Sequence, residues 1–136
     1  MPTKIFVNLP VKDLEASMTF FKTLGYTFNP QFTDETAACM VISDDIYAML
    51  LTEKKFKEFT KKQIADATKT TEVLTCLSTD SKDEVNRIVD AAMKAGATEA
   101  REPMDYGFMY GRSFNDLDGH IWEIIHMDMA AVPQKP

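Results

Sequence analysis

One acidic residue stands out in an apolar strand near the end of the sequence. Glu123 lies in the segment IWEII, residues 121–125, where its four neighbours are isoleucine or tryptophan. Burying a carboxylate among apolar side chains costs free energy unless it is paired with a cation or hydrogen-bonded, or is kept for a function. Glu123 is therefore a candidate metal ligand, general base or ligand anchor, and a structural ion pair is the plain alternative.

Arg112 is the expected partner in that ion pair. If a four-residue turn, 116–119, joins two antiparallel strands, Arg112 falls opposite Glu123 on the same face. An adjacent arginine would hold the carboxylate ionised and hydrogen-bonded. A β-bulge in either strand would flip the pairing and place Ser113 there instead.

The remaining reactive side chains offer weaker sites. Cys76 is expected on the face of Glu123, but no histidine is placed beside it, so a catalytic thiolate has no visible activator. A small buried thiol more often serves packing. His120 and His126 have the opposite strand parity to Glu123, and we expect no metal role for them. Zinc-protease, G-x-S-x-G, P-loop and dinucleotide motifs are absent from the sequence.

The segment MDYGFMYGR, residues 104–112, is rich in aromatic residues, methionines and glycines. Tyr106, Phe108 and Tyr110 are candidates for lining a pocket, with ordinary core and edge packing as the alternative. The chain has 9 Met in 136 residues, and methionine suits adaptable apolar surfaces.

The composition limits the possible partners. The formal net charge is −6, and no basic patch of the kind that binds nucleic acid is present; EKKFKEFTKK, residues 53–62, mixes both signs. The apolar runs are shorter than the roughly 20 residues of a membrane span. Cys39 and Cys76 show no disulfide framework, and the N-terminus begins a strand pattern and not a signal peptide. We expect a soluble cytoplasmic protein.

The predicted strands and helices that position these side chains follow an order that occurs twice along the chain. Asp13 suits a helix N-cap, and Gly25 and Gly96 suit helix ends. The expected order is strand 4–9, helix 14–24, hairpin strands 37–42 and 46–51, a charged and partly helical linker 53–70, strand 72–78, helix 80–97, and strands 108–114 and 120–126. This order predicts an α+β fold with two tandem βαβββ modules, about 1–52 and 71–128, in a single domain 1–136. Each half is too small to bury a sheet face well by itself.

The sequence resembles a known group at both ends of this pattern. VKDLEAS, residues 11–17, follows the first strand, and the chain closes with F-x-D-x-D-G-H-x-W-E, residues 114–123. These motifs resemble the vicinal oxygen chelate superfamily, which includes glyoxalase I, extradiol dioxygenases and the fosfomycin- and bleomycin-resistance proteins. The resemblance covers about residues 4–127 and is greatest to small bacterial glyoxalase-like proteins labelled predicted lactoylglutathione lyase. Leu117 departs from it, because the turn usually carries proline.

The resemblance implies a half-open barrel cleft with helices on the outer faces. Metal-dependent members hold their ion with four ligands, and the matching positions here are Phe6, Met49, Leu74 and Glu123. Three of the four are apolar, and one carboxylate cannot hold a divalent ion alone. Shifting the alignment by one residue supplies no further ligand set. We therefore expect no metal and no other cofactor.

The leading hypothesis is a metal-free protein that binds a small apolar or aromatic molecule in the cleft, with Glu123 and Arg112 as anchors. The expected cleft residues are Phe6, Asn8, Tyr47, Met49, Leu51, Leu74, Cys76, Tyr110, Arg112 and Glu123. One alternative is a glyoxalase-type lyase or isomerase, with Glu123 as base or ligand and a metal held by unlocated residues. Another is a vestigial interaction domain. The resemblance also implies a homodimer; the sequence names no substrate.

Overall fold

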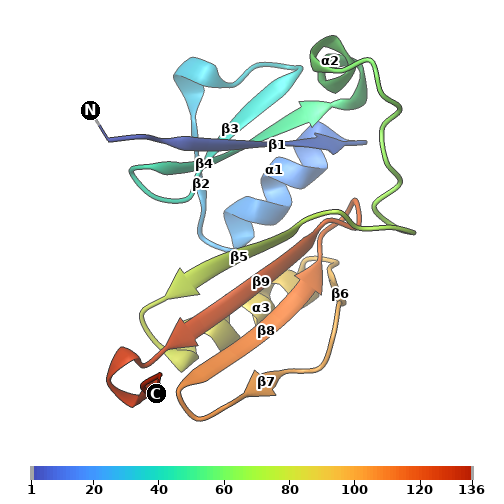
Figure 1. The fold of residues 1–136 in the computed structure, drawn as a ribbon. Coiled ribbons are helices and arrows are strands. Elements are labelled where there is room, and N and C mark those ends of the chain that lie inside the picture. Colours follow the sequence, from blue (N-terminus) through green and yellow to red (C-terminus); the bar gives the residue numbers. More distant parts are fainter. Residues whose placement is uncertain (1, 136) are drawn as a thin grey trace. The chain divides into compact units, whose positions relative to one another are not determined.

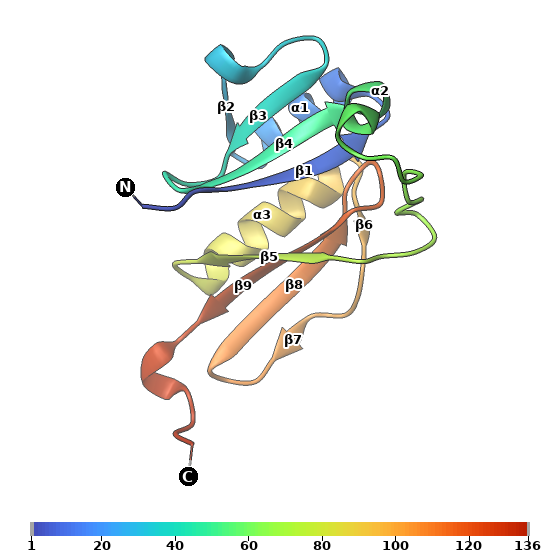
Figure 2. The same ribbon diagram turned by 45° about the horizontal axis from the view of Figure 1, so that its top comes forward.

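The computed structural model describes residues 2–135 and forms two compact units, Met1–Asp66 and Ala67–Pro136. Each unit consists of an open β-sheet with a helix packed on one face (Figures 1 and 2). The mixed α+β fold with its two sheets confirms the fold class expected from the sequence. That the units make up a single domain stays a prediction.

The first unit contains a four-stranded sheet in the order β1-β4-β3-β2. Strands β1 and β4 are parallel, and the other neighbours are antiparallel. Its elements are β1 (Ile5–Val11), α1 (Leu14–Thr23), β2 (Thr27–Asn29), a 3-10 turn (Pro30–Phe32), β3 (Ala37–Val41), β4 (Ile46–Thr52), α2 (Glu53–Phe56) and a 3-10 turn (Lys57–Phe59).

The start and end of α1 follow from its flanking residues. The Asp13 carboxylate accepts a hydrogen bond from the Ala16 amide at 3.1 Å, as an N-cap does. Gly25 follows the helix with φ of 105°, a conformation that glycine adopts without steric cost. The buried Phe21 and Leu24 then pack toward the sheet and close the core of this unit.

The second unit contains a sheet in the order β5-β9-β8-β6, with β7 also paired to β8. Strand β5 is parallel to β9, and β8 is antiparallel to β9. Its elements are β5 (Leu74–Thr79), α3 (Lys82–Lys94), β6 (Thr98–Glu99), β7 (Met104–Asp105), β8 (Met109–Asn115), β9 (Ile121–Met127) and a 3-10 turn (Met129–Ala131).

Helix α3 covers one face of this sheet. The Ser81 hydroxyl caps it by accepting from the Glu84 amide at 3.1 Å. The helix presents buried Val85 and Val89, and the sheet presents buried Phe114 and Trp122. Because side chains alternate along a strand, the neighbours of Phe114 and Trp122 point to the opposite, open face.

The register of β8 and β9 corrects the expected ion pair. Arg112 lies opposite Ile124, and Ser113 lies opposite Glu123. The turn between the strands is closed by a hydrogen bond from the Asp116 amide to the His120 carbonyl at 2.9 Å. This pair encloses residues 117–119, and the pairing is shifted by one residue from the expected one, which places Arg112 on the opposite face from Glu123.

Asp116 stabilises this turn from inside. One carboxylate oxygen accepts from the amides of Asp118 and His120, and the other accepts from the Trp122 indole at 2.9 Å. Burial raises the pKa of Asp116, and the charge of His120 and these hydrogen bonds act against that rise. The D-x-D-G-H-x-W motif is thus a turn held by its first carboxylate.

The linker expected at 53–70 begins with α2 and a 3-10 turn, which confirms its partly helical character. Among the described residues, the helices are too short or too polar to span a bilayer.

Candidate functional site

The candidate site is the face of the second sheet that α3 leaves open. Glu123 on β9 lies between Cys76 on β5 and Ser113 on β8, its register partners on either side. Leu74 and Ile125 share this face by strand alternation. The site therefore combines one carboxylate, one thiol and one hydroxyl with apolar neighbours.

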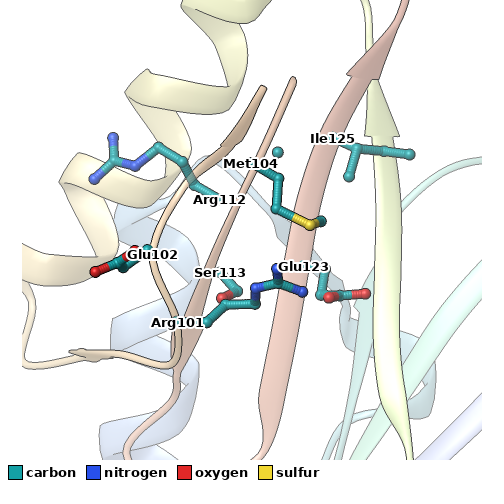
Figure 3. Close-up of a pocket in the computed structure, with 8 residues that line it drawn as sticks. Arg101, Glu102, Met104, Arg112, Ser113, Glu123 and Ile125 are labelled. Atoms are coloured by element: carbon teal, nitrogen blue, oxygen red, sulfur yellow. The ribbon is translucent and has the colours of Figure 1, made fainter. Parts of the chain in front are cut away.

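A small pocket of about 10 Å³ opens beside Glu123 (Figure 3). Six of the residues that line it are Arg101, Met104, Gly111, Ser113, Glu123 and Ile125. A Cβ atom on Gly111 would lie only 3.0 Å from Cγ2 of Ile125. Glycine at this position therefore lets Ile125 pack over the strand.

The side chain of Glu123 has no partner in this pocket. Within residues 2–135 it forms no hydrogen bond and no ion pair. Arg101 extends its guanidinium toward Glu123 in Figure 3, but no ion pair joins them. The structural ion pair considered from the sequence is thus not formed, and the carboxylate faces the pocket.

Ser113 is the second polar group of the pocket. It is only 2% exposed, and its Oγ has no hydrogen-bond partner in the described part of the chain. Buried hydroxyls are normally hydrogen-bonded. The sequence predicts Ser113 beside Glu123 only if a β-bulge is present, and no neighbouring residue indicates that its hydroxyl is unsatisfied.

Arg112 and Tyr110 were expected beside Glu123; Arg112 lines the pocket, but its guanidinium points away from Glu123 (Figure 3), and Tyr110 does not line it. Arg112 pairs with Asp90 of α3 at 2.9 Å and donates to Asn86 at 3.0 Å, and the Tyr110 hydroxyl donates to Asn86 at 2.7 Å. Both side chains therefore lie on the helix side of the sheet. The predicted Glu123–Arg112 anchor pair is wrong, because the register of β8 and β9 is shifted by one residue from the expected one.

Cys76 shares the open face of Glu123, as the sequence predicted. Partial burial, and next the charge of Glu123, raise the pKa of the Cys76 thiol. The thiol is therefore held in its protonated, weakly nucleophilic form at neutral pH.

The first unit also has an open face, which carries the predicted residues Phe6, Asn8, Tyr47 and Met49 as two cross-strand pairs. The Phe6 and Tyr47 rings stack at 4.7 Å with an interplanar angle of 12°, and Phe6 remains 48% exposed. The Asn8 amide donates to the Phe6 carbonyl. This face thus presents an exposed aromatic pair.

The other aromatic residues singled out in the sequence lie at the hairpin between β7 and β8. Tyr106 is 61% exposed and stacks with Phe108 at 6.2 Å. Neither lines the pocket beside Glu123.

Comparison with known proteins finds a family model that matches part of the chain and solved structures with the same fold. A model described as "Bleomycin resistance protein-like N-terminal" matches residues 3–43. The solved structure of the hypothetical protein SA1046 from S. aureus is 30% identical, over 93% of this chain and 95% of that chain, with a TM-score of 0.77. The chain is thus similar to the bleomycin resistance protein-like family over its N-terminal part, and it shares its fold with a protein to which it is 30% identical.

Other solved structures share the fold at lower identity. A glyoxalase-related enzyme from Fulvimarina pelagi is 19% identical over 93% of this chain and 88% of that chain, with a TM-score of 0.76. A bleomycin resistance determinant encoded on the transposon Tn5 is 16% identical over 94% of this chain and 100% of that chain, with a TM-score of 0.64. No curated protein matches the sequence.

The resemblance to the vicinal oxygen chelate superfamily implies a metal, and the donor set here does not fit one. Strand registers pair Phe6 with Tyr47 and Asn8 with Met49 in the first unit. In the second unit, Cys76 is the side chain that the strand register places beside Glu123 on β5. Among residues 2–135, no three His, Cys, Asp or Glu side chains gather as a metal site needs. The homodimer implied by the resemblance stays a prediction.

Proposed function

We propose that this protein binds a small apolar or aromatic molecule that carries a positive charge, without a divalent metal. The ligand lies on the open face of the second sheet, and Glu123 anchors its charge. The observation that carries the proposal is the Glu123 carboxylate, which has no hydrogen-bond or ion-pair partner among the described residues and lines a small pocket with Met104 and Ile125. Sites for small molecules commonly combine apolar surface with a few polar anchors.

The charges around the pocket favour a cation. Four charged residues line the pocket, and the charge of one of them, Arg112, is already neutralised by its ion pair with Asp90. The other three are one cation, Arg101, and two carboxylates, Glu102 and Glu123. The pocket therefore has one negative charge in excess. The net charge of −6 adds a long-range attraction for cations.

The surface around Glu123 supplies the apolar contact. Leu74 is 54% exposed on the neighbouring strand, and Met104 and Ile125 line the pocket.

Hexylammonium and hexyltrimethylammonium are titrated into the nitrogen-15-labelled protein, and binding is measured by NMR from the amide chemical shifts. Both cations should shift the amides of residues 74–76 and 121–125, and hexanoate should not. Glu123→Gln should weaken binding of both cations about fivefold, the order of a partly exposed charge pair. Glu99→Gln, an exposed carboxylate on β6, is the matched control and should leave binding unchanged.

Equal binding of hexanoate, or cation binding that Glu123→Gln does not weaken, would contradict the anchor. If neither cation shifts these amides, the vestigial interaction domain becomes the better account of the chain.

Divalent metals test the alternative of a glyoxalase-type lyase. Ni²⁺, Mn²⁺ and Zn²⁺ should leave the melting temperature unchanged, because a ligand raises it only by binding the folded state. Differential scanning calorimetry with and without chelator measures this. A rise that chelator reverses and Glu123→Gln abolishes would favour the lyase, with Glu123 as metal ligand or base.

A further inference from the structure

We propose that the pocket between Glu123 and Ser113 selects a primary ammonium group over larger cationic groups. This inference rests on the proposed function and names the ligand's head group. Three properties of the pocket support the inference. They are the unsatisfied hydroxyl of Ser113, a volume that holds about one heavy atom, and the carboxylate of Glu123, which only accepts hydrogen bonds.

The unsatisfied hydroxyl belongs to Ser113. Its Oγ is buried and has no partner among the described residues, although it lines a pocket. A buried polar group without a hydrogen bond is unfavourable, and its partner is commonly a water molecule or a ligand atom. Ser113 and Glu123 lie directly opposite each other on β8 and β9, so one atom in the pocket can reach both.

The volume of the pocket limits that atom. About 10 Å³ is roughly the space of one water-sized group. An ammonium group has this size. A trimethylammonium or a guanidinium group does not fit, and would remain on the surface above the pocket.

The hydrogen-bonding capacity of the two side chains fixes the polarity of the group. An ionised carboxylate only accepts hydrogen bonds, whereas a serine hydroxyl both accepts and donates. An atom that bridges them must therefore donate to Glu123. A primary ammonium group donates up to three hydrogen bonds and also matches the charge of Glu123, whereas a carbonyl or carboxylate oxygen of a ligand has nothing to donate.

Arg101 is the competing cation at this pocket. Its exposed side chain extends toward Glu123 without forming an ion pair (Figure 3). A ligand cation must therefore share the pocket rim with it. Arg101→Gln should strengthen binding of hexylammonium, and an anionic ligand would show the reverse.

The head groups are compared by isothermal titration calorimetry of the full chain with hexylammonium, hexyltrimethylammonium and hexanol. In the unmodified protein, hexylammonium should bind about tenfold more tightly than either other compound, the usual value of a hydrogen bond to a charged group. Ser113→Ala should remove most of this advantage and leave the affinity for hexyltrimethylammonium unchanged. Ser78→Ala, on the open face of β5 but outside the pocket lining, is the matched control and should change neither.

Folding does not obscure this test. Ser113→Ala removes a hydroxyl that has no partner, so the variant should be at least as stable as the unmodified protein. The comparison of head groups in the unmodified protein needs no variant.

Equal affinities for both cations, or an affinity for hexylammonium that Ser113→Ala does not change, would show that the pocket holds only water and would overturn the ammonium site. The proposed function would survive that result if Glu123→Gln still weakened both cations. Failure of both cations to bind would overturn the two proposals together.

Discussion

Replacing Gly119 with alanine is expected to lower the free energy of unfolding by about 3 kcal/mol. Two effects add at this position. Gly119 has φ of 91°, where a side chain strains the backbone. A Cβ atom there would also lie 2.8 Å from the Ala67 carbonyl oxygen and 2.9 Å from the Thr68 nitrogen. Both contacts are with backbone, so no rotamer change relieves them.

Gly107→Ala separates the two effects. Gly107 has φ of 81°, but nothing lies within 4 Å of the Cβ position. We expect a loss of about 1 kcal/mol there, from the backbone conformation alone. Urea unfolding followed by tryptophan fluorescence measures both variants, because the single tryptophan, Trp122, lies in the second unit. If Gly119→Ala costs no more than Gly107→Ala, the close approach of residues 67–68 to this turn is not a determinant of stability.

The elements were predictable from the sequence where local chemistry decides them. Asp13 caps α1 as expected, and Gly25 follows the end of that helix in the conformation that favours glycine. The hairpin of β3 and β4 matches its predicted strands within one residue. These features depend on a few adjacent residues, and the sequence displays all of them.

The candidate site was predictable only in part. Glu123 and Cys76 share the predicted face, because the alternation along β5 and β9 is undisturbed. The face of Arg112 depended on where the turn closes, and a register shifted by one residue places its side chain on the helix side. Side chains alternate between the two faces of a strand, so an error of one residue in the predicted register moves every side chain of the strand to the other face.

The pocket itself depends on contacts that a sequence does not show. Arg101 and Met104 reach it from the segment that precedes β8, distant in sequence from Glu123. The missing partner of Ser113 is a property of its surroundings and not of the residue. A serine in a strand carries no local mark of whether its hydroxyl is satisfied.

The register that places Ser113 opposite Glu123 depends on Asp116, and Asp116→Ala is expected to cost about 4 kcal/mol of unfolding free energy. The side chain is only 7% exposed and accepts hydrogen bonds from the Trp122 indole and from the amides of Asp118 and His120. Alanine would leave the buried indole without an acceptor and would free the turn. Asp128→Ala, which removes an exposed carboxylate that accepts from the Ala130 amide, is the control and should cost about 1 kcal/mol or less.

Asp116→Asn divides the effect into charge and hydrogen bonding. Burial raises the pKa of Asp116, so the ionised form is unfavourable in the folded state and its removal offsets part of the loss. The asparagine keeps one oxygen acceptor but presents an NH₂ group at the other position, where it replaces one acceptor with a donor. We therefore expect Asp116→Asn to lose about half as much stability as Asp116→Ala by urea unfolding. Cross-strand NOEs between Ser113 and Glu123 should persist in Asp116→Asn and weaken in Asp116→Ala. If Asp116→Ala is as stable as the unmodified protein, the Asp116 carboxylate does not hold the turn that positions this site.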